Sequence, residues 1–308
     1  MKKASRNLLL CAAGLLLAGI LYYIYLPAIN IHSANFWFFI MGLLVVGMLI
    51  YAFKKAGRQI LFSDGHFVLT DPNFREQMNV LKYPGILLLA VFAIYLIGSI
   101  LSSPIVNAGK YQRLMTIAER NFTDDIAEAD YNTIPLLDKD SAAILGNRKM
   151  GSLVDMVSQF EVSNDYTQIN YQGRPVRVTP LSYASPIKWL TNNRNGIPAY
   201  ILIDMATQNT ECVKLQAGIK YSKSEYFNRY LYRHLRFRYP TYIFDDQIFF
   251  EIDEEGTPYW VCPVKKFNIG LFGGQTIGNV VLCNAVTGEC VDYAVEDVPQ
   301  WVDKVYSA

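Results

Sequence analysis

Nucleophilic catalysis by a serine or cysteine needs a histidine base nearby, and the sequence offers one candidate after residue 103. This is His234, which follows Leu231 by three residues and Phe227 by seven. That spacing places His234 on or beside the apolar face of a predicted helix. The chain has no Gly-x-Ser-x-Gly elbow. We therefore predict a packed or capping histidine and no catalytic residue.

Thiol chemistry is the second possibility. The five cysteines are Cys11, predicted to be inert packing in an apolar run, and Cys212, Cys262, Cys283 and Cys290. A two-residue turn at Thr287-Gly288 would place Cys290 opposite Ala285, so we predict that Cys283 and Cys290 do not bridge. A disulfide from Cys262 to either of them stays open. The chain has no Cys-x-x-Cys and no zinc-like Cys/His spacing, so we predict no metal and no cofactor.

Carboxylates cluster at several places, but none has the spacing of a known site. Asp124, Asp125, Glu128 and Asp130 lack the calcium-loop pattern. Asp245-Asp246 and Asp253–Glu255 are neighbours in turns, whereas glycosidases need two acids facing each other across a cleft. The loop 270–279 is rich in glycine but lacks the Lys-Ser/Thr of a phosphate-binding loop. We predict solvated acidic loops and a flexible 270–279 connection.

One basic surface is the best candidate for binding. A capping box, Ser222-Lys-Ser-Glu225, predicts a helix that runs from Tyr226 to Tyr239. Spacing of i, i+4 and i+7 would put three arginines on one side of this helix, with tyrosines beside them. We call this set the Arg–Tyr surface; it consists of Arg229, Arg233, Arg236, Tyr226 and Tyr230. Guanidinium groups pair with phosphate or carboxylate, and tyrosine adds contact area. The alternative is a solvated basic face whose tyrosines pack on the sheet.

Three apolar runs, 7–29, 35–53 and 84–103, are each near the roughly 20 residues that cross a bilayer. Lys and Arg precede the first run and populate the loop 54–83, while the loop between the first two runs has none. The positive-inside rule then places the N-terminus and loop 54–83 in the cytoplasm and everything after about residue 104 outside. A cleavable signal peptide is the rival interpretation of the first run, but no clean cleavage site follows it.

The domain plan follows from these runs. Residues 1–103 are predicted to form a three-helix transmembrane region, with an Asp64-Gly65 hairpin in its cytoplasmic loop 54–83. Residues 104–139 form a stalk and connector. Two α+β units, 140–217 and 218–308, then combine helices with antiparallel hairpins. In the first unit, 136–160 predicts one or two short helices broken near Gly146.

The hairpin turns carry a family resemblance. Asn284, Thr287, Gly288 and Glu289 match the Asp/Asn-x-x-Thr-Gly-Glu turn of PepSY and cystatin-like extracytoplasmic units. In the first unit, Asp204, Thr207 and Glu211 take similar places, with a longer turn and Gln208–Thr210 where glycine is expected. The resemblance covers about residues 140–308 and implies a duplicated PepSY-like architecture. The whole chain also resembles an uncharacterised family of Gram-positive bacterial membrane proteins whose members often continue further, which implies a short member or a fragment.

These features predict a non-enzymatic, membrane-anchored extracytoplasmic binding protein. It would act as a scaffold, sensor or regulator of an envelope process, and the PepSY resemblance implies a peptidase as one target. The expected partners are a cell-envelope protein or an anionic wall polymer, and membrane lipid. The net charge of +1 gives no indication of nucleic acid. Small residues in the apolar runs would permit homo-oligomers. Two alternatives are a component of an oligomeric transporter or channel, and an envelope enzyme with an unrecognised site.

Overall fold

The computed structural model describes the backbone of residues 2–56, 60–63, 66–69, 79–114, 119–121 and 134–306, and the side chains of 12–54, 79–114, 119–121 and 134–306. The chain divides into two compact units. We call Met1–Met115 with Phe267–Gln275 the helical unit, and Thr116–Lys266 with Thr276–Ala308 the sheet unit. The predicted acidic cluster at 124–130, the Asp64-Gly65 turn and the Cys11 side chain lie outside the described residues.

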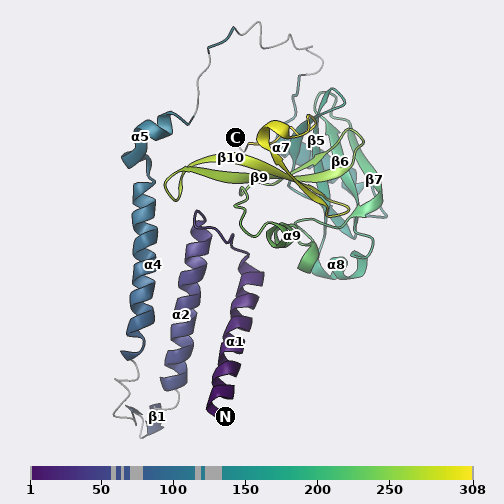
Figure 1. Cartoon of the computed structure of the whole chain (residues 1–308). Coiled ribbons are helices and arrows are strands. Elements are labelled where there is room, and N and C mark those ends of the chain that lie inside the picture. Colours follow the sequence, from purple (N-terminus) through teal and green to yellow (C-terminus); the bar gives the residue numbers. More distant parts are fainter. Residues whose placement is uncertain are drawn as a thin grey trace. The chain divides into compact units, whose positions relative to one another are not determined.

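The helical unit contains long apolar helices (Figure 1). Its elements are α1 (Lys2–Tyr25), α2 (Ala34–Ala56), β1 (Ile60–Ser63), β2 (His66–Leu69), α4 (Lys82–Leu101) and α5 (Pro104–Gln112). Among the described residues, two segments, Ala34–Lys54 and Lys82–Leu101, are long and apolar enough to cross a membrane, and Ala12–Tyr25 is a shorter apolar helix. Helices α2 and α4 pack together, with the Phe38 and Tyr95 rings 5.1 Å apart.

The glycine-rich loop is held in place within the helical unit. Ser102, at the end of α4, accepts hydrogen bonds at its Oγ from the backbone N–H groups of Leu271, at 2.9 Å, and Phe272, at 3.1 Å. Tyr111 of α5 accepts the N–H of Gly274 at 3.1 Å and donates to Ser102 O at 2.8 Å. These backbone donors hold the loop, and β10 already begins at Gly273, so the predicted 270–279 connection is shorter than expected.

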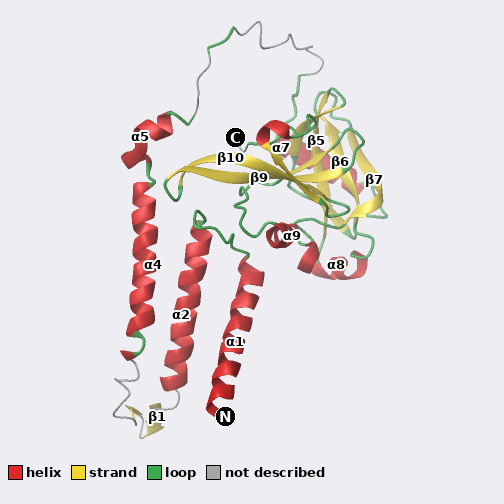
Figure 2. Ribbon diagram, in the orientation of Figure 1, coloured by secondary structure: helices red, strands yellow, loops and turns green. Residues whose placement is uncertain are grey.

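The sheet unit contains two antiparallel sheets (Figure 2). The first combines α7 (Lys139–Gly151), β3 (Phe160–Val162), β4 (Thr167–Tyr171), β5 (Arg174–Tyr183), α8 (Pro186–Asn192), β6 (Ile197–Asp204) and β7 (Thr210–Ile219). Its order is β3-β5-β6-β7, and β4 also pairs with β5. The second combines η2 (Phe227–Arg229), α9 (Leu231–Arg238), β8 (Phe249–Ile252), β9 (Pro258–Ile269), β10 (Gly273–Asn284), β11 (Cys290–Ala294) and η3 (Val295–Asp297), in the order β11-β10-β9-β8.

The two sheets share a strand order and a core. Both contain an antiparallel meander that follows helical residues: β4-β5-β6-β7 after α7, and β8-β9-β10-β11 after α9. Tyr200 of β6 lies 6.1 Å from Phe250 of β8, which lies 5.3 Å from Trp260 of β9, measured between ring centroids. All three side chains are fully buried. One apolar core therefore stabilises both sheets.

Helix α7 differs from its prediction. It continues through Gly146 without a break, and Gly146 is buried. A Cβ at this position would lie 2.1 Å from the hydroxyl oxygen of Tyr166. The glycine therefore serves close packing against the segment that precedes β4, and this accounts for its place inside a helix better than a break does.

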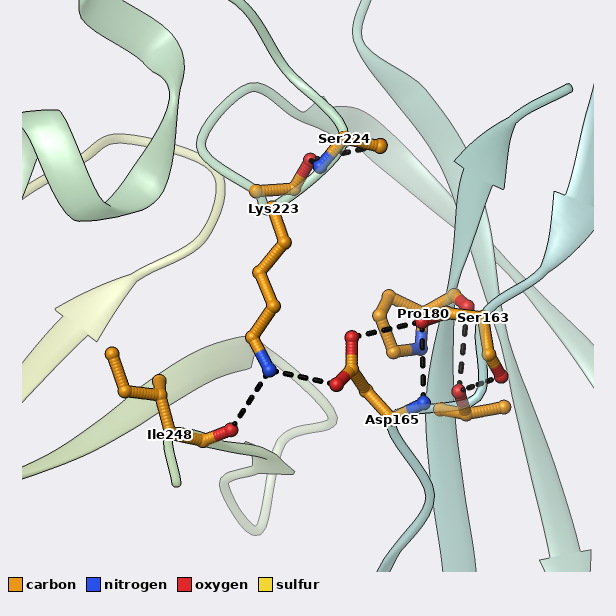
Figure 3. Close-up of polar contacts among 8 residues, drawn as sticks. Ser163, Asp165, Pro180, Lys223, Ser224 and Ile248 are labelled. Carbon is orange, nitrogen blue, oxygen red and sulfur yellow. Dashed lines mark hydrogen bonds and ion pairs between the residues drawn. The ribbon is translucent and has the colours of Figure 1, made fainter. Parts of the chain in front are cut away.

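A lysine connects the loop after β3 to the chain before β8 (Figure 3). Lys223 Nζ lies 2.7 Å from Asp165 Oδ1 and donates to Ile248 O at 3.1 Å. Asp165 is held in turn by Ser163, whose Oγ donates to Asp165 Oδ2 at 2.9 Å. The two charged side chains are 24% and 31% exposed, so this ion pair is more shielded from water than the Lys214–Asp155 pair, at 63% and 61%.

Candidate functional site

The helix predicted to carry the Arg–Tyr surface is shorter than expected. Residues 227–229 form the 3₁₀ turn η2, and α9 begins only at Leu231. Tyr230 between them has φ −61° and ψ 118°, which is extended backbone. The predicted continuous helix from Tyr226 to Tyr239 is therefore wrong. The i, i+4, i+7 spacing does not place Arg229 on the same helical face as the other two arginines.

The three arginines bind backbone carbonyl groups of their own unit. Arg229 Nη1 donates to Asn193 O at 2.6 Å, and Arg233 Nη1 donates to Phe227 O at 2.8 Å. Arg236 Nη1 donates to Tyr242 O at 2.6 Å. A carbonyl oxygen of the same unit thus engages the Nη1 group of each guanidinium. The arrangement favours a structural role for the guanidinium groups.

The tyrosines of this surface pack on other rings. Tyr226 lies 4.7 Å from the ring of Trp189, and Tyr230 lies 5.5 Å from that of Tyr232. Arg233 lies 5.5 Å above the ring of Tyr230, within the range of a cation–π contact. Tyr226 remains 42% exposed. The alternative interpretation of a basic face with packed tyrosines therefore fits these contacts better than an open anion site.

The capping box is also wrong, because its glutamate has distant partners. Glu225 is 2% exposed, and its carboxylate accepts hydrogen bonds from Tyr183 Oη at 2.9 Å and from Trp189 Nε1 at 2.7 Å. Burial raises the pKa of Glu225, and these two hydrogen bonds oppose that shift. Ser222 forms an isolated bridge with Tyr230 in place of a helix cap.

Asp204 organises the turn between β6 and β7. Its Oδ1 accepts the backbone N–H groups of Ala206 at 3.0 Å and Thr207 at 2.8 Å, which lowers the pKa of its carboxyl. The N–H of Asp204 donates to Asn209 O at 2.9 Å. Thr207 Oγ1 accepts the N–H of Asn209 at 3.3 Å, and Gln208 has a positive φ of 62°.

Asn284 organises the turn between β10 and β11 in the same way. Its Oδ1 accepts the N–H groups of Val286 and Thr287, both at 2.9 Å. The N–H of Asn284 donates to Glu289 O at 2.8 Å, and Thr287 Oγ1 accepts the N–H of Glu289 at 3.2 Å. Gly288 has a positive φ of 76°. Each of the four hydrogen bonds given above for the first turn has a counterpart here.

This match corrects the sequence comparison of the two turns. Asn209, and not Glu211, takes the place of Glu289, and Gln208 takes the place of Gly288. The turns therefore have the same length, and the predicted longer first turn is wrong. Aspartate and asparagine are interchangeable at the first position because the turn uses one side-chain oxygen as an acceptor.

A cleft in the sheet unit is lined by both turns. Its volume is about 690 Å³. Residues from β6, from β7, from the β8–β9 turn and from the two matched turns line it, among them Tyr200, Asp204, Gln216, Gly256 and Thr287. Strand β7 is the last strand of its sheet, and its pairing with β6 shifts register between Ile197 and Ala199. The cleft thus lies along an edge strand that bulges.

Two cysteines and the histidine form a compact group of potentially reactive side chains. The side-chain ligand atoms of His234, Cys283 and Cys290 all lie within 4.8 Å of one another. Cys283 is directly opposite Cys290 in the β10–β11 ladder. The prediction that Cys290 faces Ala285 is wrong, because the Asn284 turn is larger than a two-residue hairpin.

The environment of the two thiols differs. Cys283 is fully buried and Cys290 is half-buried. The hydrogen bond from Cys283 lowers the pKa of Cys290, and His234 and Arg238 lower it further against the effect of burial. The pKa of Cys283 is raised by the same partnership and by burial. His234 Nε2 lies 2.7 Å from Gly288 O, and its ring lies 4.4 Å from that of Tyr221.

The acidic turns have structural partners. Lys265 Nζ lies 3.2 Å from Asp245 Oδ1 and 2.9 Å from Asp246 Oδ2, so the predicted solvated loop is in part an ion-pair site. Asp253 Oδ1 accepts the N–H of Thr257 at 2.7 Å and stabilises the β8–β9 turn.

Comparisons with models of known protein families, with curated proteins and with solved structures find no match.

Sequence reasoning missed one buried carboxylate. Glu251 of β8 is 0% exposed and accepts the backbone N–H groups of Asp303 at 2.9 Å and Lys304 at 3.0 Å. Burial raises its pKa to about 7 against the effect of these two donors. Its place in the strand Phe249–Ile252, among apolar residues, was the available signal, since an acid at such a position needs a partner.

Proposed function

We propose that this protein is a non-enzymatic, membrane-anchored binding protein that holds an extended segment of a cell-envelope protein in the cleft of its sheet unit. It would act there as a scaffold, sensor or regulator. The observation that carries the proposal is the cleft itself, built along the edge strand β7 and closed by the two matched turns.

The membrane part of the proposal combines sequence and structure. The apolar segments of α1, α2 and α4 would cross the bilayer three times, with the N-terminus and loop 54–83 in the cytoplasm. Two of these helices have the required length and composition in the described residues.

An alkaline phosphatase fusion tests the orientation. Fusion after residue 308 should be active outside the cell, and fusion after residue 55 should be inactive. The reverse pattern would contradict the proposed orientation.

The cleft suits a peptide strand. An edge strand offers backbone donors and acceptors along one side, and proteins commonly bind extended peptides by adding a strand to such an edge. Tyr171 and Tyr200 supply aromatic rings to the lining. We therefore favour an extended protein segment as the ligand, with backbone hydrogen bonds along β7.

Charge favours a protein segment over an anionic wall polymer. The lining contains two cations, Arg174 and Lys214, and three carboxylates, Asp204, Glu211 and Glu255. Both cations have acidic neighbours: Arg174 lies 3.7 Å from Asp204, and Lys214 lies 3.2 Å from Asp155. A polyanion would meet net repulsion in this cleft.

The matched turns and the shared meander order support the PepSY-like, duplicated interpretation of the sheet unit. PepSY-like units are associated with restraining peptidases. We therefore propose an envelope peptidase as the preferred protein partner. A homo-oligomer formed through the apolar helices would be compatible with this arrangement.

A photo-crosslinking amino acid at Gln216 tests the site. Glu161 on β3, which is exposed at the opposite edge of the same sheet, is the matched control position. The full chain is crosslinked in the cells that naturally produce it, and adducts are sequenced. The proposal predicts one protein adduct, mapped to a single extended segment, from Gln216 and not from Glu161. This adduct should disappear when Ala217→Trp fills the cleft. Polymer or lipid adducts alone, or equal adducts at both positions, would contradict it.

A further inference from the structure

We propose that Cys283 and Cys290 are a reversible dithiol–disulfide pair that exchanges with disulfides of small molecules or proteins and closes a covalent link at the base of the Asn284 turn. This inference does not rest on the proposed binding function. It is argued from register, from exposure and from the groups around the two sulfur atoms.

The register provides the geometry. Cys283 and Cys290 are direct Cα partners in the antiparallel β10–β11 ladder. Opposed Cα atoms in such a ladder are about 4.5–5.5 Å apart. Disulfides span Cα separations of about 4.4–6.8 Å. The two residues are therefore within bridging distance without a rearrangement of the backbone, and their sulfur atoms lie within 4.8 Å of each other.

The two thiols differ in access, as an exchange mechanism requires. Cys290 is half-buried and Cys283 fully buried, so only Cys290 is open to attack an incoming disulfide. His234, Arg238 and the Cys283 thiol lower the pKa of Cys290. Cys283 then serves as the resolving thiol, protected from outside reagents until the first bond has formed.

The chemistry balances as thiol–disulfide exchange. The Cys290 thiolate attacks one sulfur of R–S–S–R′, forms a Cys290–S–S–R bond and releases R′S⁻, which takes up a proton. The Cys283 thiol then loses its proton to solvent and its sulfur attacks Cys290 Sγ, and the displaced R–S⁻ takes up a proton to give R–SH. Two thiols are oxidised, and one external disulfide is reduced to two thiols. Excess small-molecule thiol reverses both steps.

The rival use of the same atoms is a metal site. Two thiolates and an imidazole could hold zinc, but a structural zinc needs a fourth ligand, and only these three groups gather here among the described residues. The nitrogen His234 Nε2 is hydrogen-bonded to Gly288 O at 2.7 Å. This bond is compatible with a disulfide and also with zinc on Nδ1, so what counts against zinc is the lack of a fourth ligand among the described residues. The geometry thus favours the disulfide.

The first experiment treats the full-length protein in detergent micelles with oxidised glutathione, then maps disulfides by mass spectrometry. We expect one intramolecular bond, Cys283–Cys290, that is reversed by reduced glutathione. Cys283→Ser should stop at a mixed disulfide on Cys290, whereas Cys290→Ser should form neither product. Cys212→Ser is the matched control and should behave as the unsubstituted protein does. A bond from Cys262 to either cysteine, or no bond under conditions that oxidise free dithiols, would overturn the proposal.

Two further measurements guard against misfolded variants and against the metal alternative. In the unsubstituted protein, iodoacetamide should modify Cys290 before Cys283. At pH 6 that reaction should slow by about tenfold in His234→Gln, because His234 is one of the groups that lower the pKa of Cys290. Zinc is then added to the reduced protein before oxidised glutathione. If stoichiometric zinc binds tightly and blocks oxidation at equal concentrations, the site is a metal site and the redox proposal fails.

Discussion

Tyr221 lies directly against Gly288, so closely that a Cβ on the glycine would be 2.4 Å from the tyrosine ring. Gly288 also has a positive φ, which side chains disfavour. Gly288→Ala should therefore destabilise the sheet unit by about 1–3 kcal/mol through strain and displacement of Tyr221. Chemical denaturation of the purified protein measures this change.

The equivalent position of the first turn supplies the control. Gln208 already carries a side chain at positive φ. Gln208→Gly should be neutral or should stabilise by up to about 1 kcal/mol, since it relieves the left-handed strain. If Gly288→Ala were as mild as Gln208→Gly, the close contact with Tyr221 would not determine the choice of glycine.

The stability of the fold should depend on pH through the buried carboxyl group of Glu251. Its pKa is raised from 4.5 to about 7 in the folded protein, so the folded state holds this proton more tightly than the unfolded state. The contribution is fully present below pH 4.5 and is lost as the pH rises through about 7. We expect the free energy of unfolding to fall by up to about 3 kcal/mol from this group between pH 5 and pH 8.

Glu251→Gln tests that assignment. Glutamine keeps one oxygen that can accept the N–H of Asp303 or Lys304, and it does not titrate. Thermal unfolding between pH 5 and pH 8 should therefore lose most of its pH dependence in this variant. Glu161→Gln, at an exposed site, should leave the dependence unchanged. An unchanged slope in Glu251→Gln would assign the titration to another group.

The sequence predicted local elements better than it predicted their connections. The β8–β9 hairpin through Glu254–Gly256 is confirmed, because Ile252 pairs with Pro258. Alternating apolar residues and a turn-forming glycine are enough for such a hairpin. The helical and antiparallel content and the membrane-length helices were likewise visible as local patterns.

The errors arose where a side chain has a distant partner. Glu225 looked like the end of a capping box, but Tyr183 and Trp189 bind its carboxylate from positions 42 and 36 residues away. No local pattern contains that information. The predicted strand partner of Cys290 was wrong for a different reason. Asn284 binds two N–H groups of its own turn, and the resulting turn is larger than the two-residue hairpin that the prediction assumed.

Lys223 provides a test of the shielded ion pair in Figure 3. Lys223→Met should destabilise the sheet unit by about 1–2 kcal/mol, because it leaves Asp165 and the carbonyl of Ile248 without this donor and removes a cation 5.2 Å from the Trp260 ring. Lys214→Met removes the exposed pair with Asp155 and should change stability by less than about 0.5 kcal/mol. Equal effects of the two substitutions would show that shielding adds nothing here.

The last prediction concerns Ser102 in the helical unit. Its Oγ is the acceptor for the N–H groups of Leu271 and Phe272. Ser102→Ala should therefore expose both amides to exchange, at least about tenfold faster in a hydrogen-exchange experiment on protein in lipid nanodiscs. Ser103→Ala is the matched control, because the Ser103 side chain makes no capping hydrogen bond to α5. Protection at Leu271 and Phe272 that survives Ser102→Ala would mean that Tyr111, through its bond to Gly274, is sufficient to hold this loop.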